Sequence, residues 1–549
     1  MHPTHQVTNQ PVEFNYNLYT SDRALQNSVA VFGGQYAADE LERYGGRAMH
    51  NLMHSASSAN NSKPVLRTHD RFGHRINQVD FHPAYHSLMT DAIEAGMPSL
   101  PWAEAKSGAH VARSALVYMH NQAEAGTTCP TTMTFSAVPA LRHQPDVTEA
   151  WIRGITSRVY DQRNLPWYEK DGLTIGMAMT EKQGGSDVRA NQSTAVAVSE
   201  TGAGKPYLLT GHKWFCSAPM SDGFLVLAQT DNGIGCFLMP RWTPEGELNS
   251  FYIQRLKDKL GNWSNASSEI EFSGAFSWLI GEEGRGINTI LEMVAMTRYD
   301  CMLGSSSLMR QAIAQALHHC SQRKSFGTTL NDHGAMQNVL ADLAVESEAA
   351  LLQTMRLAKA LDAENDSNAD QEFEQLLLRL ATPVGKFWIC KRTPDMVAES
   401  LECHGGSGYV EESVMPRLFR ESPLNSIWEG CGNIQSLDVL RAIAKQPTVA
   451  DAYLHELEKQ KGSDSIFDKF LNELKDDVAA NKFTETSARA LASRLARALQ
   501  AAMMIQYASS AGAEFYLASR VATEHGIYGV HDDAANAQKI IDDALPMAG

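Results

Sequence analysis

The spacing of apolar residues changes near residue 173, and this change constrains the fold of the 549-residue chain more than any other feature. From there to residue 281 the sequence breaks into short, often alternating segments separated by Gly, Asn and Asp: 173–181, 193–199, 206–218, 223–230, 233–240 and 268–281. Such segments are typical of β-strands. Residues 1–170 read mostly as helix and loop, whereas the later segments 287–323, 335–361, 372–402 and 433–444 are long and amphipathic. The sequence therefore predicts an α+β chain in which a helical part, a β domain and a helical bundle follow one another.

Composition narrows the class of protein. The chain carries 63 acidic and 47 basic residues, a net charge of −16, which argues against broad nucleic-acid binding but leaves a local basic patch open. Its eight cysteines form no Cys-x-x-Cys pair, so we expect neither a metal site nor a disulfide framework. No apolar run approaches the roughly 18 residues of a membrane span, and the N-terminus lacks a signal core. We therefore expect a cytoplasmic protein that does not bind membranes.

A glycine-containing stretch at 426–440 holds the strongest candidate for catalysis. Glu429 follows the apolar pair Ile427 and Trp428 and precedes a glycine turn. A helical pattern begins at Asn433, whose short polar side chain suits an N-cap. A carboxylate beside an indole is partly desolvated, which raises its pKa and suits it to act as a base. From these residues alone, a loop carboxylate that faces water is the simpler alternative.

Two segments of the expected β domain carry residues that suit ligand binding. The segment 177–187 follows a strand, and its Gly-Gly pair would let backbone N–H groups approach a ligand, helped by the hydroxyls of Thr180 and Ser186. In the segment 213–217, Trp214 offers a large apolar face. The simpler alternatives are that 177–187 is only a glycine-containing hairpin and that Trp214 is only a core residue.

Two further segments complete a set of five that resembles the acyl-CoA dehydrogenase family. Residues 323–327 read Arg-Lys-Ser-Phe-Gly, and residues 402–409 contain Gly-Gly-Ser-Gly-Tyr. Neither the glycine string in 402–409 nor Gly430-x-Gly432 is a dinucleotide fingerprint inside a βαβ unit, so NAD is disfavoured. The resemblance implies an acyl-CoA dehydrogenase-like fold with an N-terminal helical domain (1–172), a middle β-barrel domain (173–285), a helical bundle that holds the FAD site and the catalytic glutamate (286–446), and an extra C-terminal helical domain (447–549).

The resemblance also implies the roles of individual residues. In this family a glutamate removes the α-proton of an acyl-CoA thioester while FAD takes the β-hydride, and Glu429 occupies that position. Arg323 is expected to reach the FAD pyrophosphate of a neighbouring subunit. Cys216 stands where the family usually has a hydroxyl, and a thiol is a poor hydrogen-bond donor, which predicts altered flavin chemistry. The implied FAD-binding residues are Met177, Met179, Thr180, Gly185, Ser186, Trp214, Phe215, Cys216, Ser217, Arg323, Phe326, Gln337, Gly405, Gly406, Ile427, Cys431 and Asn433.

Four stretches, 14–25, 179–192, 256–272 and 420–442, and the extra helical C-terminus resemble one branch of this family, the flavoproteins of the bacterial adaptive response to alkylation damage. This resemblance covers nearly the whole chain. That similarity implies a homotetramer with FAD, weak dehydrogenation of short or branched acyl-CoA, and binding of double-stranded DNA through the C-terminal domain. Arg489, Arg494 and Arg497 would lie within an arc of roughly 140° on one helix, joined by Arg441 and Arg520. Judged by charge alone, this is a solvated helix face.

Two other functions are left open by the sequence. One is a metabolic acyl-CoA dehydrogenase whose extra domain serves only oligomerisation. The other is a DNA-protecting protein in which FAD is structural. Retention of Glu429 favours catalysis.

Overall fold

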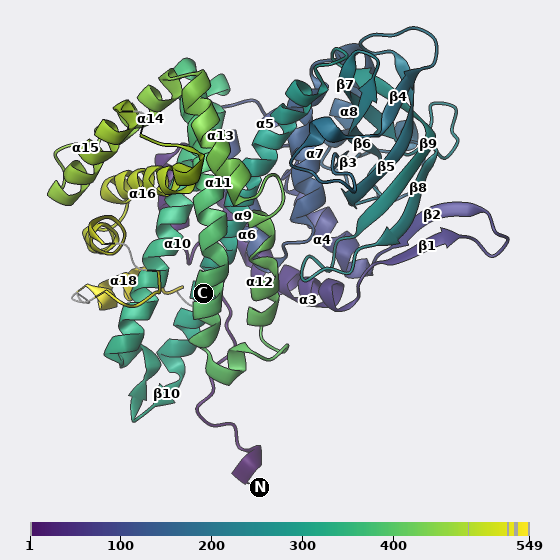
Figure 1. The fold of residues 1–549 in the computed structure, drawn as a ribbon. Helices are drawn as coiled ribbons and strands as arrows, with labels where there is room; N and C mark the ends of the chain where they lie inside the picture. Colours follow the sequence, from purple (N-terminus) through teal and green to yellow (C-terminus); the bar gives the residue numbers. More distant parts are fainter. Residues whose placement is uncertain (1–2, 481, 524–525, 532–535, 547–549) are drawn as a thin grey trace. The chain divides into compact units, whose positions relative to one another are not determined.

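The structure, a computed structural model, describes residues 3–480, 482–523, 526–531 and 536–546. The chain divides into two compact units, which Figure 1 shows with their elements labelled. The helical unit consists of residues 1–50, 106–122 and 301–549, and the β unit consists of residues 51–105 and 123–300. The first 172 residues therefore contribute to both units.

A closed sheet forms the centre of the β unit. Its strands are β3 (Ile175–Ala178), β4 (Thr194–Ala197), β5 (Pro206–Ser217), β6 (Gly223–Thr230), β7 (Gly233–Pro240), β8 (Phe251–Leu256) and β9 (Ser267–Ile280). They follow the order β3-β6-β4-β5-β9-β7, with β8 paired to β9. Because β6 also pairs with β7 along its whole length, the sheet closes into a barrel. The α+β fold with a middle β domain is confirmed.

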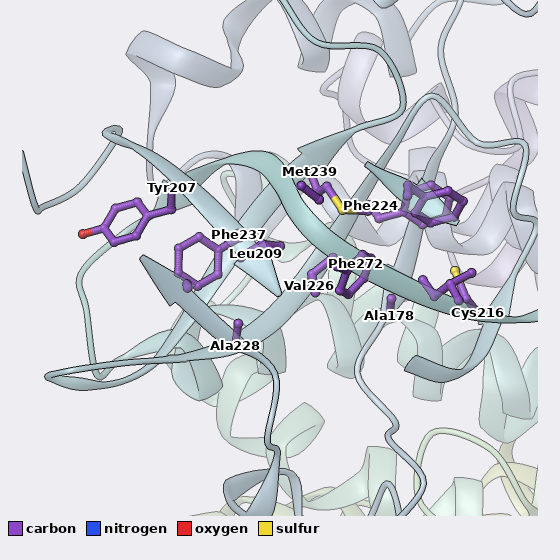
Figure 2. Packing of buried hydrophobic residues seen from close by; sticks show 14 of the residues in the cluster. Ala178, Tyr207, Leu209, Cys216, Phe224, Val226, Ala228, Phe237, Met239 and Phe272 are labelled. Carbon is purple, nitrogen blue, oxygen red and sulfur yellow. The ribbon is translucent and has the colours of Figure 1, made fainter. Parts of the chain in front are cut away.

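Inward-facing side chains of several strands fill the barrel. In β5 the buried positions include Tyr207, Leu209 and Cys216, whereas β6 is buried at every position from 223 to 228. A strand that is covered on both faces reads as a continuous apolar run rather than as an alternating one. Figure 2 shows the Cys216 sulfur in the same cluster as Phe224 and Phe272. The side chain of Cys216 thus belongs to the core of the barrel.

Three β elements were not expected from the sequence. The smallest is a hairpin of β10 (Lys324–Ser325) and β11 (Thr328–Thr329). Strand β8 pairs with β9, and a separate hairpin is formed by β1 (Val65–His69) and β2 (Arg75–Asp80). Val79 of β2 is buried in a hydrophobic cluster, and Leu66 of β1 packs against it, but no residue of β1 is fully buried, so the sequence shows no strong alternation. The remaining helices of the β unit are α3 (Met53–Asn61), α4 (Pro83–Glu94), α5 (Leu100–Ala103), α7 (Thr128–Leu141) and α8 (Pro145–Ile155).

Long helices form the helical unit, and they follow the expected segments closely. The main ones are α9 (Gly286–Gln322), which begins in the β unit, α10 (Gly334–Leu361), α11 (Gln371–Glu402) and α13 (Gly432–Lys445). The others are α1 (Arg23–Val31), α2 (Ala38–Arg47), α6 (Ala109–Ala123), α12 (Met415–Glu421), α14 (Thr448–Glu458), α15 (Ser465–Ala479), α16 (Ala488–Tyr507), α17 (Ser510–Tyr516) and α18 (Ala537–Ala544). Helices α14, α16 and α18, all beyond residue 446, pack on α10 or α11.

The N-terminus of α13 differs from the expectation. The helix begins at Gly432 with Cys431 at the N-cap, and no side chain caps it. Asn433 is therefore inside the first turn and not at the N-cap. Across the described ranges, no helix is long and apolar enough to cross a bilayer, and no three His, Cys, Asp or Glu side chains are grouped as metal ligands.

Candidate functional site

The loop before α13 holds Glu429 in an uncommon backbone conformation. Glu429 has φ of +58°, in the left-handed region. For an L-residue this region costs roughly 1–2 kcal/mol, and such strain is found at functional sites when the surrounding structure enforces it. The neighbouring Trp428 is fixed by a hydrogen bond from its Nε1 to Asn425 Oδ1 (2.9 Å). The loop is thus built around one conformation of the candidate base.

Two buried side chains enforce this conformation. Lys386 on α11 donates through Nζ to the backbone O of Trp428 (2.7 Å) and of Gly430 (2.6 Å). Gln435 on α13 donates through Nε2 to the backbone O of Glu429 (2.9 Å) and of Gly430 (3.0 Å). Lys386 and Gln435 are 1% and 0% exposed. All three consecutive carbonyls of the loop are therefore held in place.

The sequence analysis did not identify Lys386 as a functional residue. A signal was present, because this lysine is the only charged residue between positions 380 and 390 of an otherwise largely apolar helix. A lysine in such a place must have hydrogen-bond acceptors, since burying an unpaired charge is costly.

The two glycine- and tryptophan-containing segments of the β unit meet as expected. Trp214 on β5 donates its backbone N–H to the O of Thr180 (2.8 Å), in the loop that follows β3. At Gly185 a Cβ would lie 2.4 Å from Thr180 Oγ1, so only glycine fits there. Thr180, Gly185 and Trp214 are thus brought together, while Ser186 is exposed on the same loop and Met177 lies on β3.

A buried ion pair that the sequence analysis missed joins these two segments. Lys213 Nζ contacts Glu181 Oε1 at 2.8 Å, and both side chains are 0% exposed. Lys213 also donates to the O of Leu227 (2.7 Å), and Glu181 accepts from the backbone N of Gln192 (2.7 Å). Burial raises the pKa of Glu181, but the Lys213 ammonium and these hydrogen bonds outweigh it and lower the pKa to about 2. Burial lowers the pKa of Lys213, which Glu181 opposes, and the ion pair fixes the loop beside Trp214.

The surface around Trp214 is aromatic, and Lys257, the cation nearest to its ring, is paired with Glu269 (2.7 Å). Lys257 Nζ lies 3.5 Å from the centroid of the Trp214 ring and 4.5 Å from that of Phe215, which is 51% exposed. Ser217 pairs with Ser267 through their hydroxyls (3.1 Å). Such a surface suits an electron-rich, planar ligand.

Cys216 requires a correction. We expected its side chain to contact the flavin, but the thiol is 0% exposed and points into the barrel core. Burial raises the pKa of the thiol, so it stays protonated. In strand β5 the residues on either side, Phe215 and Ser217, face away from the core. Cys216 can therefore contact a ligand only through its backbone atoms.

Arg323, just beyond α9, is held by an N-terminal strap, which we define as residues 9–14. Arg323 Nη1 donates to the backbone O of Asn9. The Asn9 side chain makes two hydrogen bonds with the backbone of Lys324, one to its O (2.9 Å) and one from its N (2.8 Å). Phe14 stacks on His318 with ring centroids 4.0 Å apart. The strap therefore fixes the position of an arginine that was expected to bind a pyrophosphate.

The other expected cofactor residues of the helical unit lie at its surface. Phe326 is 99% exposed and Ile427 is 64% exposed. Gln337 donates to Gln538 Oε1 (3.0 Å), and Gly405 has φ of +59°. Gly406, Cys431 and Asn433 are also exposed.

The five arginines expected to bind DNA do not form one exposed face, and this expectation is wrong for two of them. Arg497 and Arg520 are only 7% and 5% exposed, and Arg520 pairs with Asp342 and Glu346. Arg497 donates to the backbone O of Arg520 (3.0 Å). Residues on one side of a helix can face either solvent or a neighbouring helix. The spacing of the arginines in the sequence does not tell which, so the expectation was wrong.

The three remaining arginines differ in their surroundings. Arg494 is paired with Asp477 (2.6 Å) and its side chain is 20% exposed. Arg441 is 57% exposed and lies 3.7 Å from Asp438. Arg489 is exposed, with its guanidinium 5.6 Å from the centre of the Phe387 ring. Arg441 and Arg489 are therefore the members of the set that water reaches most readily.

Family models match three successive stretches of the chain. The model for the adaptive response protein AidB N-terminal domain matches residues 9–162, the acyl-CoA dehydrogenase middle domain matches 176–275, and the acyl-CoA dehydrogenase C-terminal domain matches 284–444. Together with the barrel, the bundle and the glutamate loop, these matches define an oxidoreductase of the acyl-CoA dehydrogenase class.

Similarity to individual proteins narrows the class. The chain is 44% identical to the putative acyl-CoA dehydrogenase AidB of Escherichia coli over 95% of this chain and 96% of that protein. The chain belongs to the AidB family of acyl-CoA dehydrogenases. Among solved structures, Caenorhabditis elegans ACDH-11 in complex with C11-CoA is 25% identical with a TM-score of 0.85 over 98% of this chain and 97% of that chain. The Bd2924 apo-form is 28% identical, with a TM-score of 0.83 over 92% and 100%.

Proposed function

We propose that this protein is an FAD-dependent oxidoreductase that removes hydrogen from the α and β carbons of a short or branched acyl-CoA, with Glu429 as the base. The observation that carries the proposal is the glutamate loop, because two buried side chains hold Glu429 in a conformation that would otherwise be unfavourable. The relative whose solved structure contains C11-CoA supports an acyl-CoA as the substrate.

The residues present fit FAD. A flat ring would find the aromatic surface of Trp214 and Phe215, with the backbone of Thr180 and Gly185 beside it. The first turn of α13 has no side-chain cap, so its N–H groups are available to a phosphate, and Cys431 and Asn433 lie there. Arg323 would supply a planar donor for the pyrophosphate of the FAD held by a neighbouring subunit. Bound FAD would supply the acceptor for the β-hydride.

The protein's own residues would act on the substrate. Glu429 accepts the α-proton, and Lys386 and Gln435 keep its backbone fixed while it does so. Release of FAD from the purified protein on denaturation, in one equivalent per chain, tests the cofactor. A colourless protein that cannot be reconstituted with FAD would contradict the proposal.

For the chain as a whole we propose the division given by the family resemblance, with residues 1–172, 173–285, 286–446 and 447–549 as its functional parts, in a cytoplasmic homotetramer. In this assembly we expect the partner subunit near Phe326, whose side chain is 99% exposed in the single chain and whose burial would be favourable. Size measurement in solution tests the tetramer.

We further propose that the protein binds duplex DNA in the response to alkylation damage, as its similarity to AidB suggests. The chain is acidic overall, so the contact must be local, and Arg441 and Arg489 are the exposed members of the expected set. We propose that they contact phosphates without reading sequence.

A double variant tests the DNA contact. Changing Arg441 and Arg489 to Ala should weaken binding alike on unrelated duplexes, and should lower the slope of log affinity against log salt by about one unit per lost contact. Arg494→Ala, on the same helix as Arg489, is the matched control, because Asp477 already neutralises that guanidinium. Unchanged affinity and slope in the double variant would refute the contact.

A second candidate function is a metabolic dehydrogenase whose last hundred residues only stabilise the fold. Buried ion pairs favour it: Arg356 on α10 pairs with Glu456 on α14 (2.6 Å), and Arg520 pairs with Glu346 on α10 (2.9 Å). These contacts commit two charged residues of the C-terminal part, Glu456 and Arg520, to packing. A parent protein that shows no affinity for duplex DNA at low salt would favour this candidate.

A further inference from the structure

The β unit contains a cavity of about 370 Å³ that is separate from the residues expected to bind FAD. It lies between α4, the segment 160–164 and the turn that joins β5 to β6. None of the expected FAD-binding residues lines it. Its volume is near the lower end of the range of about 300–1,000 Å³ for small-molecule sites.

Aromatic rings form one side of the cavity. Phe81 and Tyr85 stack with their ring centroids 4.1 Å apart. His86 lies against Tyr160, and the two are hydrogen-bonded at 3.0 Å. Trp242 also lines the cavity, with its Nε1 held by Asn164 (3.1 Å). These walls suit a flat ring better than a flexible aliphatic chain.

The charges that line the cavity do not balance. Lys170 and Asp222 form a buried ion pair (2.5 Å, side chains 4% and 7% exposed). Arg241 is only 4% exposed and donates to the backbone O of Pro219 (2.6 Å) and of Asn77 (3.4 Å), with no salt bridge to any described residue. Two cations thus share one carboxylate. Burial lowers the pKa of Arg241 to about 10, which reflects the cost of an insufficiently neutralised charge.

The other carboxylates of the cavity do not correct this imbalance. Asp80 is paired with Arg67 (2.6 Å), and Asp161 is paired with Arg163 (2.5 Å). Each of these pairs is neutral by itself. The group formed by Lys170, Asp222 and Arg241 therefore keeps one net positive charge.

An unpaired hydroxyl lies in the same place. Ser221 lines the cavity, is 3% exposed, and its Oγ has no hydrogen-bond partner. A buried polar atom without a partner costs roughly 1–3 kcal/mol, so a group that accepts a hydrogen bond from Ser221 would be favoured.

We propose that this cavity is a binding site for a small aromatic carboxylate, whose ring lies among Phe81, Tyr85 and Tyr160 and whose monoanionic group faces Arg241 and Ser221. The carboxylate would neutralise the excess charge and give the serine an acceptor. The proposal is independent of the FAD site and of any acyl-CoA chemistry.

Binding of benzoate to the purified protein, measured by calorimetry, tests the proposal. We expect one benzoate per chain, and much weaker binding of acetate, which lacks the ring, and of benzyl alcohol, which lacks the charge. Ser221→Ala should weaken benzoate binding by about tenfold or more, because the lost hydrogen bond is made to a charged group. The matched control is Ser99→Ala, because Ser99 Oγ is also buried without a partner but lies outside the cavity.

Each result of these experiments either supports the proposed site or overturns it. Weaker binding to the Ser221 variant than to the Ser99 variant, with benzoate seen against Arg241 in a crystal, supports the site. No binding to the parent, equal binding to both variants, or a crystal in which only water contacts Ser221 would overturn it. Equal affinity for acetate or benzyl alcohol would overturn the assigned ligand class.

Discussion

Replacing Lys386 with methionine should separate catalysis from folding. Methionine has a similar length and fills the same space, but it cannot donate to the backbone O of Trp428 and Gly430. Hydrogen bonds from a charged donor contribute about 1.5–3 kcal/mol each. The left-handed backbone of Glu429 costs about 1–2 kcal/mol, so the loss of both bonds removes more than the strain that they oppose.

The expected loss of activity follows from positioning. Once the loop relaxes, Glu429 moves relative to its proton, and a displacement of about 1 Å can lower the rate on the order of 10²-fold. The effect on stability should be smaller. Gly430 O keeps its bond to Gln435, so only Trp428 O is left without a partner, at a cost of about 1–3 kcal/mol. Removing a buried ammonium offsets part of this cost.

A double-mutant cycle with Glu429→Gln gives the sharpest assay. We would measure kcat/KM for acyl-CoA oxidation with an artificial electron acceptor, together with urea denaturation. If Lys386 acts through Glu429, Lys386→Met should change the rate of the Glu429→Gln enzyme by less than about twofold. Lys359→Met, at an exposed position of α10, is the control. Full activity of Lys386→Met, or independent effects of the two substitutions, would refute the reasoning.

Three further predictions concern the surrounding structure. Lys213→Met leaves the Glu181 carboxylate buried without its cation, so the free energy of unfolding in urea should fall by about 3–5 kcal/mol; a loss below about 1 kcal/mol would contradict this. Because folding lowers the pKa of Glu181 from 4.5 to about 2, its stabilisation is complete above pH 4.5 and is lost as the pH falls toward 2. The urea midpoint should therefore depend less on pH in this range in Glu181→Gln, and an unchanged profile would argue against the pair. Asn9→Ala removes two hydrogen bonds from the strap that holds Arg323, so FAD retention on dialysis should fall by up to about tenfold; retention equal to the parent's would mean that the strap does not position this arginine.

The architecture could be predicted from the sequence because it depends on the periodic spacing of apolar residues. The long amphipathic segments and the alternating β segments appeared nearly where expected, since burial on one face or both leaves a period in the sequence. The hairpin β1–β2 was not predicted because few of its residues are buried, and so few leave no period in the sequence.

The site was only partly predictable. Thr180, Gly185, Trp214 and Glu429 could be chosen from short motifs. Lys386 and Glu181 act through partners that are distant in sequence; a single charge in an apolar stretch indicates that Lys386 has a buried partner, but not which one. Cys216 was misassigned because a motif gives a position and not the direction of a side chain. Arg497 was misassigned because its helix is packed on several sides within the helical unit.

The role of Glu429 is the centre of this account, and one comparison tests it most directly. The parent and Glu429→Gln would be purified, and their FAD content and their rate of oxidation of a short or branched acyl-CoA measured side by side. The account predicts equal FAD content and a rate lower by about 10²–10⁴-fold in the variant, because the amide keeps the shape of the carboxylate but cannot accept the proton. Equal rates in the two proteins would contradict it.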